Sequence, residues 1–171
     1  MIHEEDPFAV PLDERDPVRR LRGRLPAPVT IVTAGAEPHW TGLTVSSLMV
    51  ADGEPGRVAF LCGRNADLGD VIAATGGFVV HVLGAADAAL SDRFAGIRPS
   101  PGGLFAGLEV VAGSRGPILT VLTTRAECRL LGVTDSGWYQ TIEGAVEDLL
   151  LGEAAEPLVR YRGRYHLLEG S

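Results

Sequence analysis

The sequence predicts a mainly β protein, a small barrel with a few flanking helices. Short apolar stretches that alternate as strands do recur along most of the chain, and turns rich in glycine, proline and aspartate separate them. Stretches with helical spacing are few. The 171 residues suffice for one domain with a sizeable core, and 46% hydrophobic with 22% charged residues is typical of a globular protein.

The chain divides into an arm and one domain. Residues 1–15 are acidic and interrupted by proline, so we expect them to form an N-terminal arm, and we expect residues 16–171 to form a single domain. Asp16 and Pro17 are a favourable helix start, and the prolines at 26 and 28 end the helix. Its apolar residues have helical spacing, so we expect this helix to pack on the barrel.

Strand patterns account for most of the domain. The predicted strands are residues 29–34, 39–51 and 58–62, then 78–83, one or two strands within 118–133, residues 138–151, and a short pair within 158–168. Residues 85–94 have a helical pattern. Residues 96–117 are rich in glycine and proline, and this long connection is either a functional lid or a simple surface loop.

Polar side chains interrupt the second strand just before a helix start. Thr44, Ser46 and Ser47 lie where a half-buried strand usually carries apolar residues, so we expect a polar ligand beside them. After the next strand, Arg64 and Asn65 precede a helical pattern, with Asn65 as the predicted N-cap. A helix start beside an arginine suits a phosphate group, and the hydroxyls suit a polyol or ring carbonyls.

A series of blocks in a fixed order gives the chain a family resemblance. The blocks are PVTIVTAG, GLTVSSLMV, VAFLCGRNADLGDVIAATGGFVVHVL, LSDRFAG, GPIL, AECRL and YRGRYHLL. Together they resemble the flavin reductase family, whose fold is the FMN-binding split β-barrel of Greek-key type. The resemblance extends over roughly residues 17–168, and the TVSS and CGRN segments are its most specific parts.

The resemblance implies an NAD(P)H-dependent flavin reductase that transfers hydride from NADH or NADPH to bound FMN, with FAD as the alternative flavin. It also implies a homodimer whose pocket is built from both chains, and a partner monooxygenase that would receive the reduced flavin. No catalytic residue is assigned, because the cofactor carries the chemistry. The implied cofactor-binding residues are Thr44, Val45, Ser46, Ser47, Cys62, Arg64, Asn65 and Ala66, and the implied nicotinamide-side residues are Tyr139 and Tyr165.

Two positions depart from the family pattern. Tyr139 stands where the family usually has a histidine near the nicotinamide, and His81 stands where it usually has an asparagine. We interpret His81 as a hydrogen-bonded core residue rather than a ligand. Tyr139 keeps two alternatives open: another type of FMN-dependent enzyme on the same fold, or a non-catalytic flavin-binding protein.

Composition excludes several other functions. All 15 basic residues are arginine, so Schiff-base chemistry and a P-loop lysine are excluded. Cys62 and Cys128 are too few and too far apart for a zinc site, and we expect buried reduced thiols and no metal. A net charge of −7 argues against nucleic acid as a partner. The chain has no apolar run of bilayer length and no basic, apolar start typical of a signal peptide, so we expect a cytoplasmic protein without a membrane segment.

Overall fold

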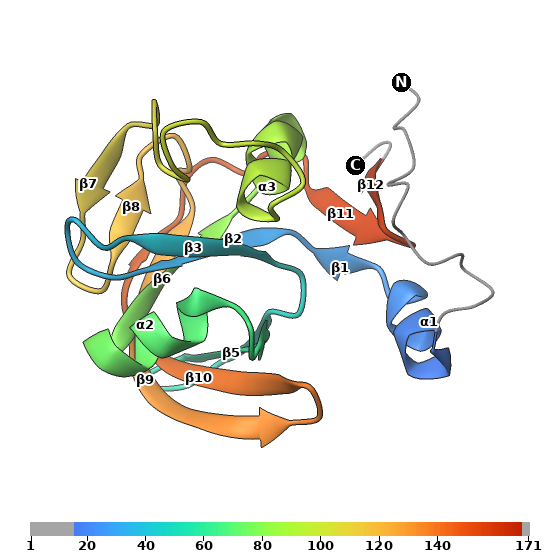
Figure 1. Ribbon diagram of the computed structural model, residues 1–171, viewed down its shortest axis with the longest axis horizontal. Helices are drawn as coiled ribbons and strands as arrows, with labels where there is room; N and C mark the ends of the chain where they lie inside the picture. Colours follow the sequence, from blue (N-terminus) through green and yellow to red (C-terminus); the bar gives the residue numbers. More distant parts are fainter. Residues whose placement is uncertain (1–15, 169–171) are drawn as a thin grey trace.

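The fold is built around one antiparallel sheet of seven strands, in the order β3-β2-β6-β9-β10-β5-β4 (Figure 1). This computed structural model describes residues 16–168, so the arm expected at 1–15 lies outside the described residues. The strands of this sheet are β2 (Thr30–Ala34), β3 (Thr41–Val45), β4 (Met49–Ala51), β5 (Arg57–Gly63), β6 (Gly77–Val82), β9 (Arg125–Ser136) and β10 (Tyr139–Leu150). The mainly β class is therefore confirmed.

Smaller sheets and three α-helices complete the described part of the chain. One sheet joins β1 (Ala27–Pro28), β11 (Leu158–Tyr161) and β12 (Arg164–Leu167), and the other joins β7 (Val110–Ala112) to β8 (Pro117–Leu119). The helices are α1 (Pro17–Gly23), α2 (Asp67–Thr75) and α3 (Ala88–Phe94), with a short 3-10 turn, η1 (Ala85–Asp87), before α3. The connection predicted at 96–117 thus contains the short strand β7 and ends at the first residue of its partner β8.

The single strand predicted at 39–51 is wrong. Its residues form β3 and β4, which lie at the two opposite edges of the seven-stranded sheet. At the break, the Leu61 N–H donates to Ser47 Oγ at 2.9 Å, and the Ser47 hydroxyl contacts the Leu61 carbonyl oxygen at 3.4 Å. The serine side chain thus takes the place of a strand pairing, because hydroxyls compete with the backbone for sheet hydrogen bonds. Among the described strands β3 and β4 do not pair, so the sheet is not closed by hydrogen bonds.

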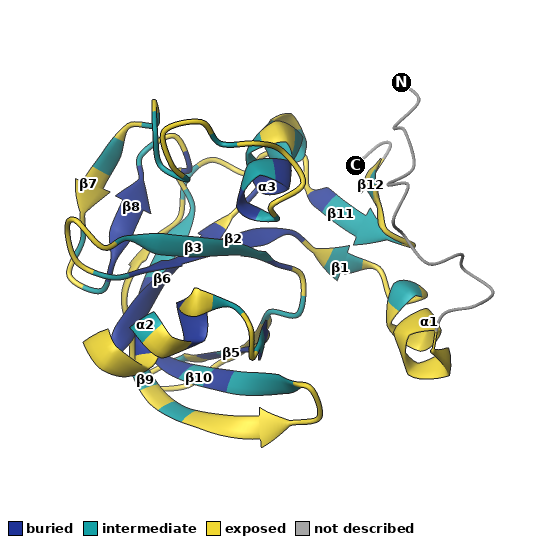
Figure 2. Cartoon of the chain, viewed as in Figure 1, coloured by how far each residue is buried: buried dark blue, intermediate teal, exposed yellow. Residues whose placement is uncertain are grey.

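Two hydrophobic clusters fill the interior. Figure 2 shows that β2, β6 and β8 are among the most buried strands. In the first cluster, α2 packs on the inner face of the sheet; its largest members are Phe60, Phe78, Leu68, Ile72 and Ile142. In the second, α3 packs with strands of all three sheets, and its largest members are Ile31, Phe94, Leu119, Leu122 and Leu158. Burial of these apolar side chains is the main stabilising contribution to the fold.

His81 is fully buried in β6 and joins three strands. Its Nε2 accepts a hydrogen bond from the Leu119 N–H at 3.1 Å, so Nδ1 carries the proton toward the Ile31 carbonyl oxygen, 3.3 Å away. Burial disfavours the charged imidazolium and lowers the pKa of His81 to about 4. The interpretation of His81 as a hydrogen-bonded core residue is therefore confirmed.

Both cysteines are free and fully buried, as the sequence predicted. Cys62 lies in β5 and Cys128 in β9, each facing the first hydrophobic cluster. Burial raises the pKa of the Cys62 thiol, and it raises the pKa of Cys128 to about 12. Both side chains therefore remain protonated thiols at neutral pH.

Helix α1 begins as predicted but does not pack on the sheet. The Asp16 carboxylate caps it by accepting from the Val18 and Arg19 N–H groups, at 2.8 and 3.2 Å. The helix has no buried residue, and its backbone stands apart from the sheet (Figure 1), although the Arg22 side chain reaches Tyr139 of β10. Its apolar side chains are exposed, at 72% for Val18 and 61% for Leu21. The expectation that α1 packs on the barrel is thus wrong, because the short strand β1 carries the chain away from the sheet.

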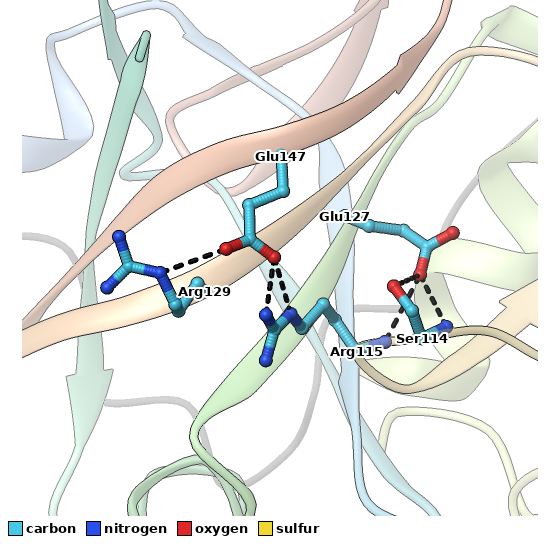
Figure 3. A network of polar contacts seen from close by, with 5 residues as sticks. All are labelled: Ser114, Arg115, Glu127, Arg129 and Glu147. Carbon is cyan, nitrogen blue, oxygen red and sulfur yellow. Dashed lines mark hydrogen bonds and ion pairs between the residues drawn. The ribbon is translucent and has the colours of Figure 1, made fainter.

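A polar network fastens the turn between β7 and β8 to the long β9–β10 hairpin (Figure 3). One oxygen of the buried Glu127 accepts from the Ser114 N–H and hydroxyl, both at 2.6 Å, and from the Arg115 N–H at 3.1 Å. The exposed Glu147 binds Arg115 and Arg129, and the hydrogen bond from Arg115 lowers the pKa of Glu147. The end of the 96–117 connection, at the turn between β7 and β8, is therefore held in place.

Candidate functional site

A cavity of about 360 Å³ lies where two helices meet the edge strand β3. In the view of Figure 1, α3 lies above the β2–β3 pair and α2 lies below it. The cavity is lined by the start of β3, the start of α2, the end of α3 and the loop beyond it; its residues are Thr41, Gly42, Leu43, Asn65, Ala66, Asp67, Leu68, Arg93, Phe94, Ala95, Gly96 and Leu104. This volume is within the range of about 300–1,000 Å³ for small-molecule sites.

The start of α2 opens onto this cavity without a side-chain cap. The N-cap is Ala66, not Asn65 as the sequence predicted, and no side chain accepts from the first turn. The predicted cap is wrong because the Ala66 N–H bonds the Gly63 carbonyl at 3.0 Å in a tight turn, which delays the helix by one residue. Backbone N–H groups at this end, together with the helix dipole, suit an anion.

Arg93 brings a positive charge to the cavity from the end of α3. Its Nη2 donates to the carbonyl oxygens of Gly103 and Ala106, at 3.1 and 2.6 Å. Its Nε is buried and has no hydrogen-bond partner among the described residues. The guanidinium is thus fixed against the loop that follows α3, with one donor unused.

The close contact between β3 and α3 depends on a glycine. A Cβ at Gly42 would lie 2.7 Å from the nearest atom of the Phe94 ring, far inside van der Waals contact. Only glycine allows that ring to lie against β3 and form one wall of the cavity.

Of the residues predicted to bind the cofactor, Asn65 and Ala66 line the cavity. Val45 and Cys62 are buried in the first hydrophobic cluster beside α2. The Thr44 hydroxyl donates to the Ser91 carbonyl oxygen at 2.6 Å, so it joins β3 to α3. These three residues support the walls of the region rather than face the cavity.

The remaining predicted residues, Ser46, Ser47 and Arg64, lie outside the lining of the cavity. Ser46 is exposed in the crossing between β3 and β4. Ser47 bonds the β5 backbone as described above. The Arg64 guanidinium forms an ion pair with Asp135 of β9, with 2.9 Å between Nη2 and Oδ1.

Tyr139 and Tyr165, the predicted nicotinamide-side residues, lie in different surroundings. The Tyr139 hydroxyl, at the start of β10, accepts from Arg22 Nη1 of α1 at 3.0 Å. The Tyr165 hydroxyl lies 2.8 Å from both Ser91 Oγ and Asp92 Oδ1 of α3, and burial raises its pKa. Tyr165 therefore positions α3, while Tyr139 contacts the exposed helix.

Sequence reasoning assigned no role to Thr41, Gly42 or Arg93, all of which line the cavity. Arg93 belongs to the LSDRFAG block. That block shows that a helical pattern ends in an arginine, but it does not show which cavity the arginine lines.

Comparison with known proteins gives the family. The family model described as flavin reductase like domain matches residues 22–169. The NADH-dependent FMN reductase AsuE2 of Streptomyces nodosus subsp. asukaensis is 35% identical over 160 residues, which are 91% of this chain and 85% of that protein. The reductase component of 4-hydroxyphenylacetate 3-monooxygenase from Thermus thermophilus is 31% identical over 145 residues, covering 85% of this chain and 91% of that protein.

The solved structures agree with that match. The NADH:FAD oxidoreductase SgcE6 of Streptomyces globisporus aligns with a TM-score of 0.81 at 26% identity, over 96% of this chain and 100% of that chain. Nitrilotriacetate monooxygenase component B from Mycobacterium thermoresistibile aligns with a TM-score of 0.79 at 28% identity, over 89% of this chain and 85% of that chain. In sequence and in fold, this chain belongs to the flavin reductase like domain family.

Proposed function

We propose that this protein is an NAD(P)H-dependent flavin reductase that binds FMN, with FAD as the alternative flavin. The observation that carries this proposal is the family match over residues 22–169, together with 35% identity to a protein named as an NADH-dependent FMN reductase. The candidate cavity is the structural observation that supports the same proposal.

The residues at the cavity fit the phosphate end of a flavin nucleotide. The start of α2 offers uncapped N–H groups, and Arg93 offers a positive charge that two backbone carbonyls hold in place. Such donors in a concave site are what a phosphate ester requires. The backbone at Asn65 and Ala66 and the side chain of Arg93 would hold the phosphate, and Thr41 and Leu43 of β3 would border the rest of the molecule.

The protein's part in the reaction is to bind the flavin and the nicotinamide, to align their rings, and to shield them from water. A bound flavin supplies the ring that accepts a hydride, one proton with two electrons, from the nicotinamide. Side chains need not move a proton for this direct transfer, so the chain must hold the two rings in contact and exclude water. Leu68 and Phe94, both buried at the cavity, form the apolar wall that limits water there.

We also propose the finer features implied by the family. The split β-barrel is supported by the position of β3 and β4, which are consecutive in the chain and occupy both edges of the sheet. A homodimer is supported by the exposed apolar side chains of α1. Transfer of reduced flavin to a partner monooxygenase is supported by the Thermus thermophilus relative, which is named as the reductase component of a monooxygenase.

The domain division and the location remain predictions. We propose that residues 16–171 are one domain and that the protein is cytoplasmic. No helix within residues 16–168 is both long and apolar enough to cross a membrane. In that same part of the chain, no group of three or more His, Cys, Asp and Glu side chains is placed to hold a metal ion.

The visible spectrum of the protein loaded with FMN tests the function. Under anaerobic conditions, NADH or NADPH should bleach the yellow absorbance of the FMN-loaded protein. A small amount of the protein should also catalyse bleaching of excess free FMN, and free FMN with the nicotinamide but without protein is the control. A yellow protein that neither nicotinamide bleaches would contradict the reductase and favour one of the two alternatives, another FMN-dependent enzyme or a flavin-binding protein without activity.

A further inference from the structure

We propose that Arg93 is the side chain that binds the phosphate of the flavin nucleotide. This inference rests on the proposed function and adds to it a specific residue. It differs from the assignment made from sequence, in which Arg64 beside the predicted helix start was the phosphate ligand.

The Arg93 guanidinium forms no ion pair with any described residue. Two backbone carbonyls, of Gly103 and Ala106, accept from the same nitrogen, Nη2. Within residues 16–168 no carboxylate forms an ion pair with Arg93, and its buried Nε has no acceptor. A partly buried cation without an ion pair is unfavourable by itself, and an anion in the cavity would offset its charge.

Arg93 and the start of α2 line the same cavity. An anion in this cavity would therefore meet a guanidinium from one helix and backbone N–H groups from another. Asp67, in the first turn of α2, is also part of the lining and its carboxylate opposes an anion. The charge of Arg93 offsets that carboxylate, so the site without Arg93 would be a poor one for phosphate.

Arg64 is less suited to bind the phosphate than Arg93. Its guanidinium already has an anionic partner in Asp135, and its side chain is 46% exposed. It is absent from the cavity lining, although its neighbours Asn65 and Ala66 are present. An exposed, paired arginine outside the cavity has less to offer a phosphate than a half-buried, unpaired one inside it.

Arg93 also links the phosphate to the loop after α3. The carbonyls that hold its Nη2 belong to Gly103 and Ala106, and the Ala106 N–H bonds the Gly103 carbonyl at 3.1 Å. A phosphate that fixes the guanidinium would therefore also steady this loop. Hydrogen exchange at the amides of residues 103–108 should slow on binding FMN and slow less on binding riboflavin, which has the same ring and ribityl chain but no phosphate.

The decisive experiment compares FMN with riboflavin by flavin fluorescence titration of the full chain. In Arg93→Gln we expect the FMN dissociation constant to rise roughly 10- to 100-fold, and the riboflavin constant to change less than twofold. Arg64→Gln should leave the ratio of the two constants unchanged. Arg98→Gln is the matched control, because Arg98 follows the same helix but is exposed, is bound to Asp92, and does not line the cavity.

The outcomes separate this inference from the proposed function. The role of Arg93 is overturned if Arg93→Gln loses affinity equally for FMN and riboflavin, or if Arg64→Gln alone loses affinity selectively for FMN. Neither outcome contradicts the proposed reductase function. If the wild-type protein binds neither flavin, the proposed function itself fails. If circular dichroism shows that Arg93→Gln does not fold, Arg93→Lys is titrated instead, because lysine keeps the positive charge. Our inference then requires the FMN dissociation constant to rise about threefold or more while the riboflavin constant stays unchanged, since lysine lacks the planar fork of the guanidinium.

Discussion

His81 gives the protein a stability that depends on pH. Its folded-state pKa of about 4 lies below the ordinary value of 6.5, so the unfolded chain takes up the proton first as the pH falls. The stabilisation from the neutral imidazole is complete above pH 6.5 and is lost as the pH falls toward 4. For this residue alone, we expect the free energy of unfolding to fall by about 2 kcal/mol between pH 7 and pH 5.

Urea unfolding of wild type and His81→Asn at the two pH values measures this effect. The variant should be less stable at pH 7 and should lack that part of the pH dependence, because asparagine does not titrate. Parallel pH profiles for the two proteins would show that the buried imidazole does not contribute as described.

Ser46 and Ser47, predicted together as flavin ligands, should behave differently when changed one at a time. Ser47→Ala removes two contacts with the Leu61 backbone and should cost about 1 kcal/mol in the free energy of unfolding. Ser46 is exposed, so Ser46→Ala should leave stability within about 0.5 kcal/mol of wild type. As a predicted flavin ligand, Ser46 should affect binding instead, so Ser46→Ala should raise the FMN dissociation constant about fivefold while Ser47→Ala should not. Equal effects of both variants on stability would refute this division of roles.

Among the elements, the β7–β8 turn depends on a single carboxylate. Glu127→Gln replaces a buried anion that accepts from Ser114 and Arg115, and we expect a loss of about 1–3 kcal/mol in the free energy of unfolding. Glu147→Gln is the control, since its ion pairs with Arg115 and Arg129 are exposed to solvent and should contribute less to stability than the buried Glu127 carboxylate. Amide exchange at Ser114 and Arg115 should quicken in the first variant only. If the control loses as much stability as Glu127→Gln, the turn does not depend on that buried carboxylate.

Most elements could be predicted from local patterns, and the errors have a common cause. The first helix start, the strand that carries His81 and the hairpin pair at the end of the chain all follow from alternation and capping chemistry. The strand at 39–51 failed because its alternation continues through Ser47, whose hydroxyl replaces backbone pairing. Only the whole sheet determines that the chain crosses there to the other edge.

The candidate site was predicted only where its residues are neighbours in sequence. Asn65 and Ala66, which line the cavity, were among the predicted residues because the approach to a helix start can be recognised locally. Arg93 was missed because nothing in its own segment shows that α3 ends beside the start of α2, which is a property of how both helices pack on β2 and β3. Gly42 was missed for the same reason, since its role is the contact with Phe94.

At the scale of the whole molecule, α1 predicts association. Leu21 on α1 is 61% exposed, and Leu25, two residues beyond the end of α1, is 59% exposed. The helix contacts the rest of the chain mainly through polar groups. We expect α1 to pack against a second copy, so Leu21→Glu should shift a dimer toward monomer in light scattering at micromolar concentration. Ile97→Glu, at a site 60% exposed in a different segment, is the control and should remain dimeric. A wild-type monomer with flavin bound would contradict the proposal.

The burial of both thiols affects how a flavin reductase resists oxidative inactivation during turnover. Reduced flavin that meets dioxygen before it reaches a partner yields hydrogen peroxide, which attacks exposed thiolates first. Cys62 and Cys128 offer neither exposure nor thiolate, because burial keeps both protonated. Oxidative damage within residues 16–168 should then fall on Met49, 64% exposed on an edge strand away from the cavity lining, so self-inactivation through cysteine is avoided by the fold itself.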